Sequence, residues 1–280
     1  MSDYVAPTTL NEAVEFLSNG QCTVLAGGTD VYPALSGRTL SEPVIDITGI
    51  HELRGINRQN NVWRMGALTT WTDVIRARLP SAFDGLKQAA RQVGSIQVQN
   101  VATVAGNLCN ASPAADGVPP LLTLDASVEL TSKTGVRSLP LSDFILGNRR
   151  TAKHPDEMLS AILIPSDCDD AISQFEKLGT RDYLVISIVS VSVLLLTENH
   201  HVKTARVAVG SCSEVSKRLT NLEAILTGCS LESNLGDSVL KEHLEPLSPI
   251  DDIRAGAAYR LDATEEMLRR TLSKCSGKAQ

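Results

Sequence analysis

The chain has 280 residues, of which 42% are hydrophobic, 21% charged and 4% aromatic, and its net charge is −6. This length suits one large or two ordinary domains, and the composition is that of a folded globular protein rather than a disordered chain. The acidic balance, the lack of a block of Lys or Arg and the scarcity of aromatic residues argue against a protein that binds nucleic acid or an anionic membrane surface.

Six cysteines are scattered along the chain without the short Cys-x-x-Cys spacing that assembles a zinc or iron–sulfur site locally. We interpret them as free thiols in a reducing compartment. The first residues lack a basic segment followed by an apolar core, so we expect no secretion signal, and the apolar stretch 183–197 is too short to span a bilayer. The sequence therefore predicts a soluble, cytoplasmic protein with no membrane span and no metal site of its own.

The first 50 residues show helix and strand signals in turn. Thr9-Leu-Asn-Glu12 has the spacing of a capping box, and apolar residues follow at helical spacing up to Gly20. A buried strand over 22–26 then meets the turn Gly27-Gly28-Thr29-Asp30. After it we expect a short helix over 31–35 and a second strand over 44–47.

From residue 56 the pattern changes to hairpins and longer helices. Asn60-Asn61 predicts a hairpin turn, and apolar residues at helical spacing predict two helices over 70–79 and 83–93. A second hairpin is expected over 126–139, and a strand over 159–164 ends at Pro165.

A short polar segment, 166–170, suits a boundary between domains. Beyond it we expect a long hairpin over 186–209, a helix over 216–226 and a final helix with one apolar stripe from Ala257 to Cys275. The order of elements predicts an α+β fold of two domains, the first of them in two lobes.

The glycine turn at 27–30 is the first candidate for a ligand site. Two glycines let the backbone approach a ligand closely, and free N–H groups at a helix start favour a phosphate. An ordinary tight turn explains the same residues, because glycine turns between strand and helix are common. Both interpretations stay open on this segment alone.

A second candidate is Thr103-Val-Ala-Gly-Asn107, followed by Ala111-Ser-Pro-Ala-Ala-Asp116. It offers another close backbone approach, with donors and acceptors for sugar hydroxyls, although a buried strand that leaves into a turn is the simpler interpretation. Two such segments, each suited to one phosphate of a dinucleotide, favour nucleotide binding, yet neither has a Rossmann or Walker fingerprint. Zinc-binding histidine spacings and hydrolase elbows are also absent from the sequence, so we predict no catalytic residue.

Taken in order, Val24 to Asp30, Asn100 to Asn107 and Ala111 to Asp116 resemble the FAD-binding medium subunit of molybdenum hydroxylases, the family of xanthine dehydrogenase and aerobic carbon monoxide dehydrogenase. Glu157-Met-Leu159 and Asp252-x-Arg254-Ala-x-x-x-Tyr-Arg260 follow in the family's order and spacing. The resemblance therefore covers nearly the whole chain.

The resemblance implies an FAD domain of the vanillyl-alcohol-oxidase type over 1–170, with lobes of about 1–55 and 56–170, and a smaller C-terminal α+β domain over 171–280. It implies that the two glycine-bearing segments hold the FAD pyrophosphate and the adjacent sugar from either side.

The resemblance also assigns single residues to the cofactor. Asp116 would bind a ribityl or ribose hydroxyl, Leu159 would pack near the flavin, and Lys177 would supply a positive charge or a donor. Val93 stands where xanthine-oxidising relatives have an aromatic residue. The residues expected to bind FAD are Val24, Leu25, Ala26, Gly27, Gly28, Thr29, Asp30, Val31, Val93, Ala102, Thr103, Val104, Ala105, Gly106, Asn107, Ser112, Asp116, Leu159 and Lys177.

Two departures from the family pattern bear on these expectations. Ala105 takes the place of the first glycine in the family's Gly-Gly-Asn turn, so a methyl group must fit there. The inserted cysteine-bearing loop of the relatives that carry an extra iron–sulfur cluster is missing, so we predict no cluster in this chain.

The function that the resemblance implies is electron transfer. A large partner subunit would oxidise the substrate at molybdopterin, a small partner subunit would carry two [2Fe–2S] clusters, and FAD in this chain would pass the electrons to NAD+ or another acceptor. A dimer of such heterotrimers is the assembly that it suggests. A self-contained FAD-dependent oxidoreductase with its own small substrate, and a nucleotide-binding module without enzymatic activity, are the alternatives.

Overall fold

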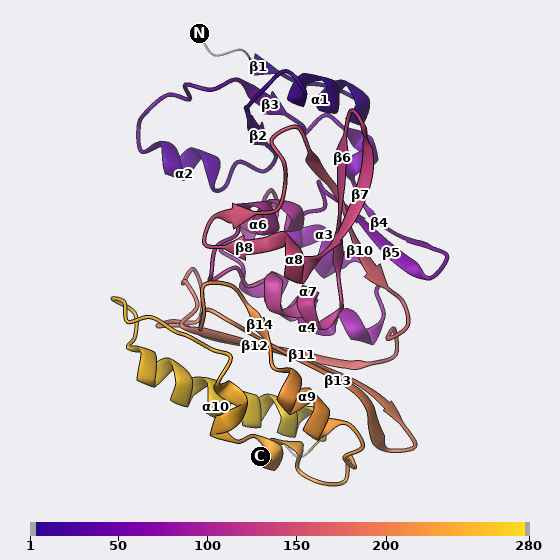
Figure 1. Ribbon diagram of the computed structural model, residues 1–280, viewed down its shortest axis with the longest axis vertical. Helices are drawn as coiled ribbons and strands as arrows, with labels where there is room; N and C mark the ends of the chain where they lie inside the picture. Colours follow the sequence, from indigo (N-terminus) through magenta and orange to yellow (C-terminus); the bar gives the residue numbers. More distant parts are fainter. Residues whose placement is uncertain (1–3, 278–280) are drawn as a thin grey trace. The chain divides into compact units, whose positions relative to one another are not determined.

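The computed structural model describes residues 4–277, and the chain forms two compact units (Figure 1). The first unit contains the residues up to 77 together with 96–111 and 126–165, and the second contains the remaining segments. This grouping by compactness assigns 78–95 and 112–125 to the same unit as the C-terminal part of the chain. The domain boundary expected near residue 170 divides the chain at a single point instead, and it stays a prediction.

A small parallel sheet in the order β1-β3-β2 opens the first unit. Its elements are β1 (Tyr4–Val5), α1 (Leu10–Leu17), β2 (Thr23–Leu25), α2 (Val31–Leu35) and β3 (Val44–Asp46). The predicted capping box forms, because the Thr9 hydroxyl accepts from the backbone N–H of Glu12 while the Glu12 carboxylate accepts from that of Thr9. Each helix and strand predicted in this part of the sequence is confirmed, with ends that differ by a residue or two.

The larger sheet of the first unit is antiparallel, with five strands in the order β4-β5-β10-β6-β7. Its strands are β4 (Ile56–Gln59), β5 (Val62–Gly66), β6 (Ser127–Ser132), β7 (Gly135–Pro140) and β10 (Met158–Pro165). The unit also contains the 3-10 turn η1 (His51–Leu53), helices α3 (Trp71–Arg76), α5 (Ile96–Gln99), α6 (Val104–Asn110) and α8 (Leu141–Phe144), and the pair β8 (Ile145–Gly147) and β9 (Arg150–Thr151). Asn60, with φ of 55°, forms the predicted hairpin turn.

The second unit is built on the antiparallel sheet β11-β12-β13-β14. Its strands are β11 (Ile172–Leu178), β12 (Val189–Glu198), β13 (His201–Gly210) and β14 (Lys217–Arg218). Its helices are α4 (Asp84–Gln92), α7 (Val118–Thr123), α9 (Thr220–Leu226) and α10 (Ala257–Cys275), with 3-10 turns η2 (Ser81–Phe83), η3 (Leu235–Ser238) and η4 (Lys241–Leu244). The helix expected from residue 216 begins only at Thr220, since Lys217 and Arg218 pair with β13 instead.

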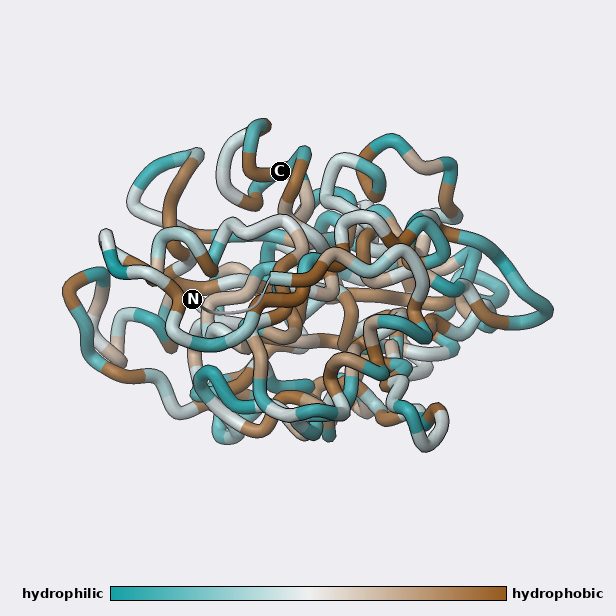
Figure 2. The backbone as a smooth tube through the Cα atoms, turned by 90° about the horizontal axis from the view of Figure 1, so that it is seen from above, coloured by the Kyte–Doolittle hydropathy of each residue, from teal (hydrophilic) through white to brown (hydrophobic). Residues whose placement is uncertain are grey.

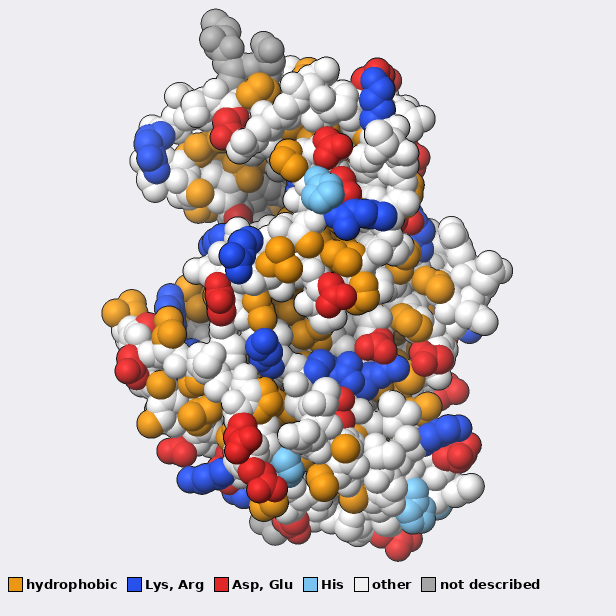
Figure 3. All heavy atoms as spheres, in the orientation of Figure 1, with side chains coloured by type: hydrophobic (Ala, Val, Ile, Leu, Met, Phe, Trp, Pro, Cys, Tyr) orange, Lys and Arg blue, Asp and Glu red, His pale blue; other side chains and the backbone are white. Residues whose placement is uncertain are grey.

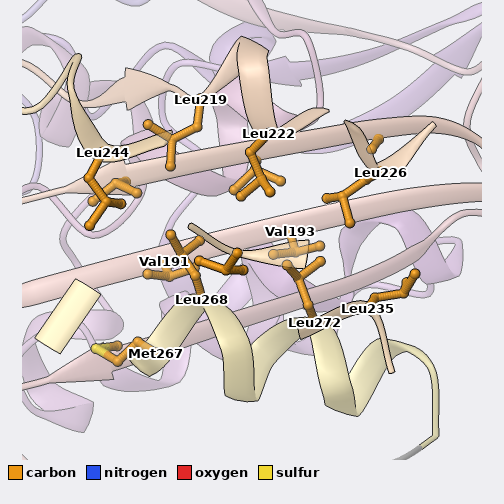
Figure 4. Packing of buried hydrophobic residues seen from close by; sticks show 14 of the residues in the cluster. Val191, Val193, Leu219, Leu222, Leu226, Leu235, Leu244, Met267, Leu268 and Leu272 are labelled. Carbon is orange, nitrogen blue, oxygen red and sulfur yellow. The ribbon is translucent and has the colours of Figure 1, made fainter. Parts of the chain in front are cut away.

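Strand β12 is buried on both faces. Val191 and Val193 point into a cluster with Leu268 and Leu272 of α10 (Figure 4). On the opposite face the Ser192 hydroxyl lies 3.1 Å from the hydroxyl of Thr123 in α7. Helices therefore cover both sides, which explains why the strand is buried from Val189 to Leu195 although Ser190 and Ser192 alternate with valines along it.

Acidic and basic side chains are interspersed on the face of the protein in Figure 3, which agrees with the modest net charge of −6. Hydrophobic and hydrophilic residues also alternate along the backbone, as Figure 2 shows. Within residues 4–277, no helix has the length and apolarity that crossing a bilayer requires.

Candidate cofactor-binding site

The predicted glycine turn forms the loop between β2 and α2. Gly28 has φ of +68°, a left-handed conformation that other residues rarely adopt, and its carbonyl accepts from the N–H of Tyr32 at 3.0 Å. Gly27 has a different constraint, because a Cβ at this residue would lie 2.0 Å from the carbonyl oxygen of Val101. One glycine is needed for the backbone conformation and the other for the close approach of two backbones.

The second predicted segment, 102–107, starts a helix. Thr103 is the N-cap of α6, and its hydroxyl accepts from the N–H of Gly106 at 2.9 Å. The N–H of Val104 donates to the carbonyl of Thr69 at 3.0 Å, which attaches this segment to the loop before α3. The interpretation of this stretch as a buried strand is therefore wrong, because the cap at Thr103 stabilises a helix where small β-branched residues suggested a strand.

The two segments meet at a cavity of about 220 Å³ in the first unit. Gly27 comes from the first segment and Thr103 from the second. The residues that line this cavity are Ala26, Gly27, Thr48, Arg54, Leu68, Thr70, Asn100, Val101 and Thr103. The fold thus brings together, at one cavity, two loops that lie far apart in the sequence.

Asn107 and Ala105 of the second segment indicate whether a ligand would fit beside this segment. The side-chain oxygen Oδ1 of Asn107 is buried and has no hydrogen-bond partner within residues 4–277, and such a group costs roughly 1–3 kcal/mol unless it is satisfied. A ligand donor would satisfy it. Ala105 is 4% exposed, so its methyl group packs inside the unit and the departure from the family's glycine is accommodated.

Asp30 closes the first segment with polar contacts inside the same unit. Asn110, at the end of α6, donates to Asp30 Oδ1 at 2.9 Å, and the Arg149 guanidinium lies 3.9 Å from the same oxygen. Arg149 also donates to the side-chain oxygen of Asn110. These contacts tie the loop between β2 and α2 to the helix that the second segment begins.

In the second unit, Lys177 and Asp116 form a buried ion pair. The ammonium Nζ of Lys177 lies 2.6 Å from Asp116 Oδ2, and the two side chains are only 5% and 8% exposed. Lys177 also donates to the carbonyls of Val185 at 2.9 Å and of Gln92 at 3.5 Å, so its three N–H donors are all used. Ser187 donates to the other carboxylate oxygen of Asp116.

Two effects shift the pKa of the Asp116 carboxyl in opposite directions. Burial raises the pKa of the Asp116 carboxyl, and the positive charge of Lys177 opposes that rise. The cluster therefore depends on the ion pair to keep the carboxylate charged. Lys177 has no donor left over, so what it offers any neighbouring group is its charge.

The other predicted residues lie apart from these clusters. Leu159 is 3% exposed and sits in β10 opposite Leu130, in the first unit. Val93 follows α4 and Ser112 accepts from the N–H of Ala114 at 3.3 Å, both in the second unit. The structure thus groups 24–31 with 102–107 in one unit, and Asp116 with Lys177 in the other.

Two residues near these groups carried no sequence motif. Arg54 and Thr48 line the cavity because of pairings between distant segments, and no spacing rule marks them. Asn100, which also lines it, begins the run 100–107 that carries the family resemblance. Ser187 did carry a signal, since it is a polar residue inside the apolar stretch 183–197, and its burial beside Asp116 explains why it is there.

Glu157, two residues before Leu159, accepts hydrogen bonds from Nε and Nη2 of Arg137, at 2.6 and 2.9 Å, and from the N–H of His154 at 2.7 Å. The Arg137 hydrogen bonds hold the pKa of Glu157 at about 2. A lowered pKa stabilises the fold above the unfolded value of 4.5, and the stabilisation is lost as the pH falls toward 2.

We expect Glu157→Gln to lower the free energy of unfolding by about 2–3 kcal/mol at pH 7, and the difference from the wild type to shrink as the pH falls below 4.5. Urea unfolding at several pH values measures both effects. Glu15→Gln is the control, because Glu15 and its partner Lys133 are 69% and 58% exposed. A difference that stays constant down to pH 3 would contradict the assignment.

Two family models match the chain in succession. The FAD binding domain in molybdopterin dehydrogenase matches residues 1–167, and the CO dehydrogenase flavoprotein C-terminal domain matches residues 174–275. These matches and the fold define an FAD-binding subunit of a molybdenum-hydroxylase-type dehydrogenase. The chain belongs to the family of FAD-binding domains of molybdopterin dehydrogenases.

Individual relatives cover nearly the whole chain. The xanthine dehydrogenase FAD-binding subunit of Escherichia coli O157:H7 is 29% identical over 98% of this chain and 95% of that subunit. The nicotinate dehydrogenase FAD-subunit of Eubacterium barkeri is 30% identical over 96% of this chain and 94% of its own length. A chain of the reconstituted CO dehydrogenase from Oligotropha carboxidovorans superposes with a TM-score of 0.92 at 25% identity and covers 100% and 99% of the two chains.

These findings confirm the predicted resemblance, the α+β class and FAD as the cofactor. The chain is part of an FAD-dependent oxidoreductase. The individual contacts between FAD and the nineteen predicted residues remain predictions.

Proposed function

We propose that this chain is the electron-transfer subunit of a multi-subunit molybdenum hydroxylase. It receives electrons from [2Fe–2S] clusters of a small partner subunit and delivers them to NAD+ or another acceptor. Bound FAD supplies the redox chemistry, since a flavin exchanges electrons singly or in pairs. A large partner subunit with molybdopterin oxidises the substrate, two heterotrimers associate, and the complex works in the cytoplasm.

The cavity between the two glycine-bearing segments carries the proposal. Residues 24–31 hold the FAD pyrophosphate and adjacent sugar on one side, and residues 102–107 hold it on the other. The approach of Gly27 to the Val101 backbone and the unpaired oxygen of Asn107 support this role, because both suit a ligand that needs backbone contact and a polar partner. Ser112 and Asp116 serve a sugar or ribityl hydroxyl, and Val93 and Leu159 pack beside the flavin.

The names of the relatives support the proposal that this chain transfers electrons. Relatives of this chain are named as FAD-binding subunits or medium chains of dehydrogenases for xanthine, nicotinate and carbon monoxide. A subunit shared by enzymes for such different substrates performs a step that they have in common. Transfer of electrons away from the site of oxidation is such a step, whereas substrate recognition belongs to a partner.

The test is reduction of the flavin in two preparations. In the complex co-expressed with its partner subunits, we expect the oxidisable substrate to bleach the flavin absorbance. In the isolated full chain, we expect NADH, where NAD+ is the physiological acceptor, to reduce the flavin, and small organic substrates to leave it oxidised. Flavin reduction by such a substrate in the isolated chain would support a self-contained oxidoreductase instead. A purified chain and complex without flavin would contradict both functions.

A further inference from the structure

We propose that Arg54 binds the anionic pyrophosphate of the dinucleotide, an inference that rests on the proposed FAD site. Arg54 lines the 220 Å³ cavity together with Gly27 and Thr103, one residue from each glycine-bearing segment. Small-molecule pockets usually measure about 300–1,000 Å³, so this cavity suits a part of a dinucleotide rather than the whole. The part that needs backbone contact and a cation is the pyrophosphate.

The Arg54 guanidinium is positioned by neutral groups. Its Nη2 donates to the carbonyl of Thr48 at 2.8 Å. That carbonyl is fixed in turn, because the N–H and the hydroxyl of Thr48 both donate to Asp46 Oδ1, at 2.9 and 2.6 Å. This hydrogen bond fixes the orientation of the Arg54 side chain. The other four of its five N–H donors remain available to a ligand.

The backbone of Arg54 is also held rigidly. A Cβ on Gly66 would lie 2.3 Å from the carbonyl oxygen of Leu53, so strand β5 packs directly against the peptide before Arg54. The N–H of Leu68 donates to that same carbonyl at 2.8 Å, and the N–H of Gly66 donates to Gly55 at 2.9 Å. Both neighbours of Arg54 are thus fixed to β5 and the loop that follows it, which lowers the entropic cost of binding through this arginine.

The charge of Arg54 is not neutralised by the protein. Within residues 4–277 no Asp or Glu forms an ion pair with it. The cavity lining contains no carboxylate, and its polar side chains besides Arg54 are those of Thr48, Thr70, Asn100 and Thr103. Asn100 accepts the Thr72 hydroxyl at 2.7 Å through Oδ1, so its Nδ2 remains a donor. The hydroxyls of Thr48 and Thr70 donate to Asp46 and Asp73, so the donors that remain beside Arg54 include the Nδ2 of Asn100. An exposed cation with such a donor beside it, at two closely packed backbones, favours an anion.

Titration of the flavin-free full chain with FAD tests this proposal. We expect Arg54→Gln to raise the Kd for FAD by about tenfold to a hundredfold, since hydrogen bonds between charged partners are lost. Arg54→Lys should lie between Arg54→Gln and the wild type. The dependence of Kd on salt concentration should become shallower in Arg54→Gln, because one cation facing the phosphates is removed. Thermal unfolding without flavin should not change.

Arg58→Gln is the matched control. Arg58 is an exposed arginine of the same unit whose guanidinium lies 5.8 Å from the ring centroid of Trp63, outside the cavity lining, and its variant should bind FAD like the wild type. Wild-type affinity in Arg54→Gln, or weaker affinity with an unchanged salt dependence, overturns the role of Arg54 and leaves the proposed function standing. A wild-type chain that binds no FAD overturns the proposed function and this inference with it.

Discussion

Gly27→Ala is expected to abolish FAD binding and to destabilise the first unit. A Cβ at this position would lie 2.0 Å from the carbonyl oxygen and 2.6 Å from the carbonyl carbon of Val101. Both atoms belong to the backbone, so the clash cannot be relieved by a side-chain rotation and the two segments must separate. Overpacking of this kind costs about 1–3 kcal/mol or more, and the separation also opens the cavity that both segments line.

FAD titration and thermal unfolding of the full chain measure the two effects. Gly49→Ala is the control, since its Cβ would have Pro7 O at 3.4 Å as its nearest neighbour, an ordinary contact, and it should bind FAD normally. Gly106→Ala should have an intermediate effect, because its Cβ would meet only the Thr103 hydroxyl, at 2.8 Å. Full flavin binding in Gly27→Ala would show that the apposed segments do not form the cofactor site.

Elements with local signals were predicted correctly from the sequence. The helix Leu10–Leu17 has its own capping box, and the hairpin at Asn60 needs a residue with positive φ, so neither depends on distant contacts. The last helix, Ala257–Cys275, was predicted from its apolar stripe alone. The glycine turn at 27–30 was also placed correctly, because a strand end and a helix start bracket it.

Most of what failed or went unnoticed depends on pairing between distant segments. The helix 104–110 has a local cap at Thr103, which went unnoticed, but its start is also held by hydrogen bonds between residues 102–104 and the loop before α3. The reason for Gly27 is Val101, a contact that no local pattern encodes. The position of Arg54 at the cavity likewise depends on β5 and on the turn after β3, and no local pattern in the sequence indicates it.

The structure gives Lys177 a structural role beside the one that the family resemblance implies. The family resemblance implies a donor or charge toward FAD, but all three of its N–H groups are bound within the second unit. Lys177 joins the end of α4, the segment that carries Asp116 and the segment that carries Val185. A residue with these contacts stabilises the second unit, whatever its charge contributes to the cofactor.

Lys177→Ala is therefore expected to lower the free energy of unfolding by about 3–5 kcal/mol, because it leaves the buried carboxylate of Asp116 without its counter-charge. Urea unfolding of the full chain measures this loss. Lys203→Ala is the control from the same unit, since Lys203 and its partner Glu198 are 54% and 62% exposed. Equal stability of the wild type and Lys177→Ala would contradict the structural role.

The double variant Lys177→Met with Asp116→Leu separates the structural role from binding of the cofactor. Replacing both partners of a buried ion pair by apolar residues is often close to neutral, so this protein should recover most of the stability that Lys177→Ala loses. If the folded double variant binds FAD as tightly as the wild type, the pair acts on the fold alone. If it is stable but binds FAD weakly, the charge of Lys177 or the carboxylate of Asp116 contributes directly to the cofactor, as the resemblance implies. Because stability is restored in both cases, the FAD affinity decides between the two roles.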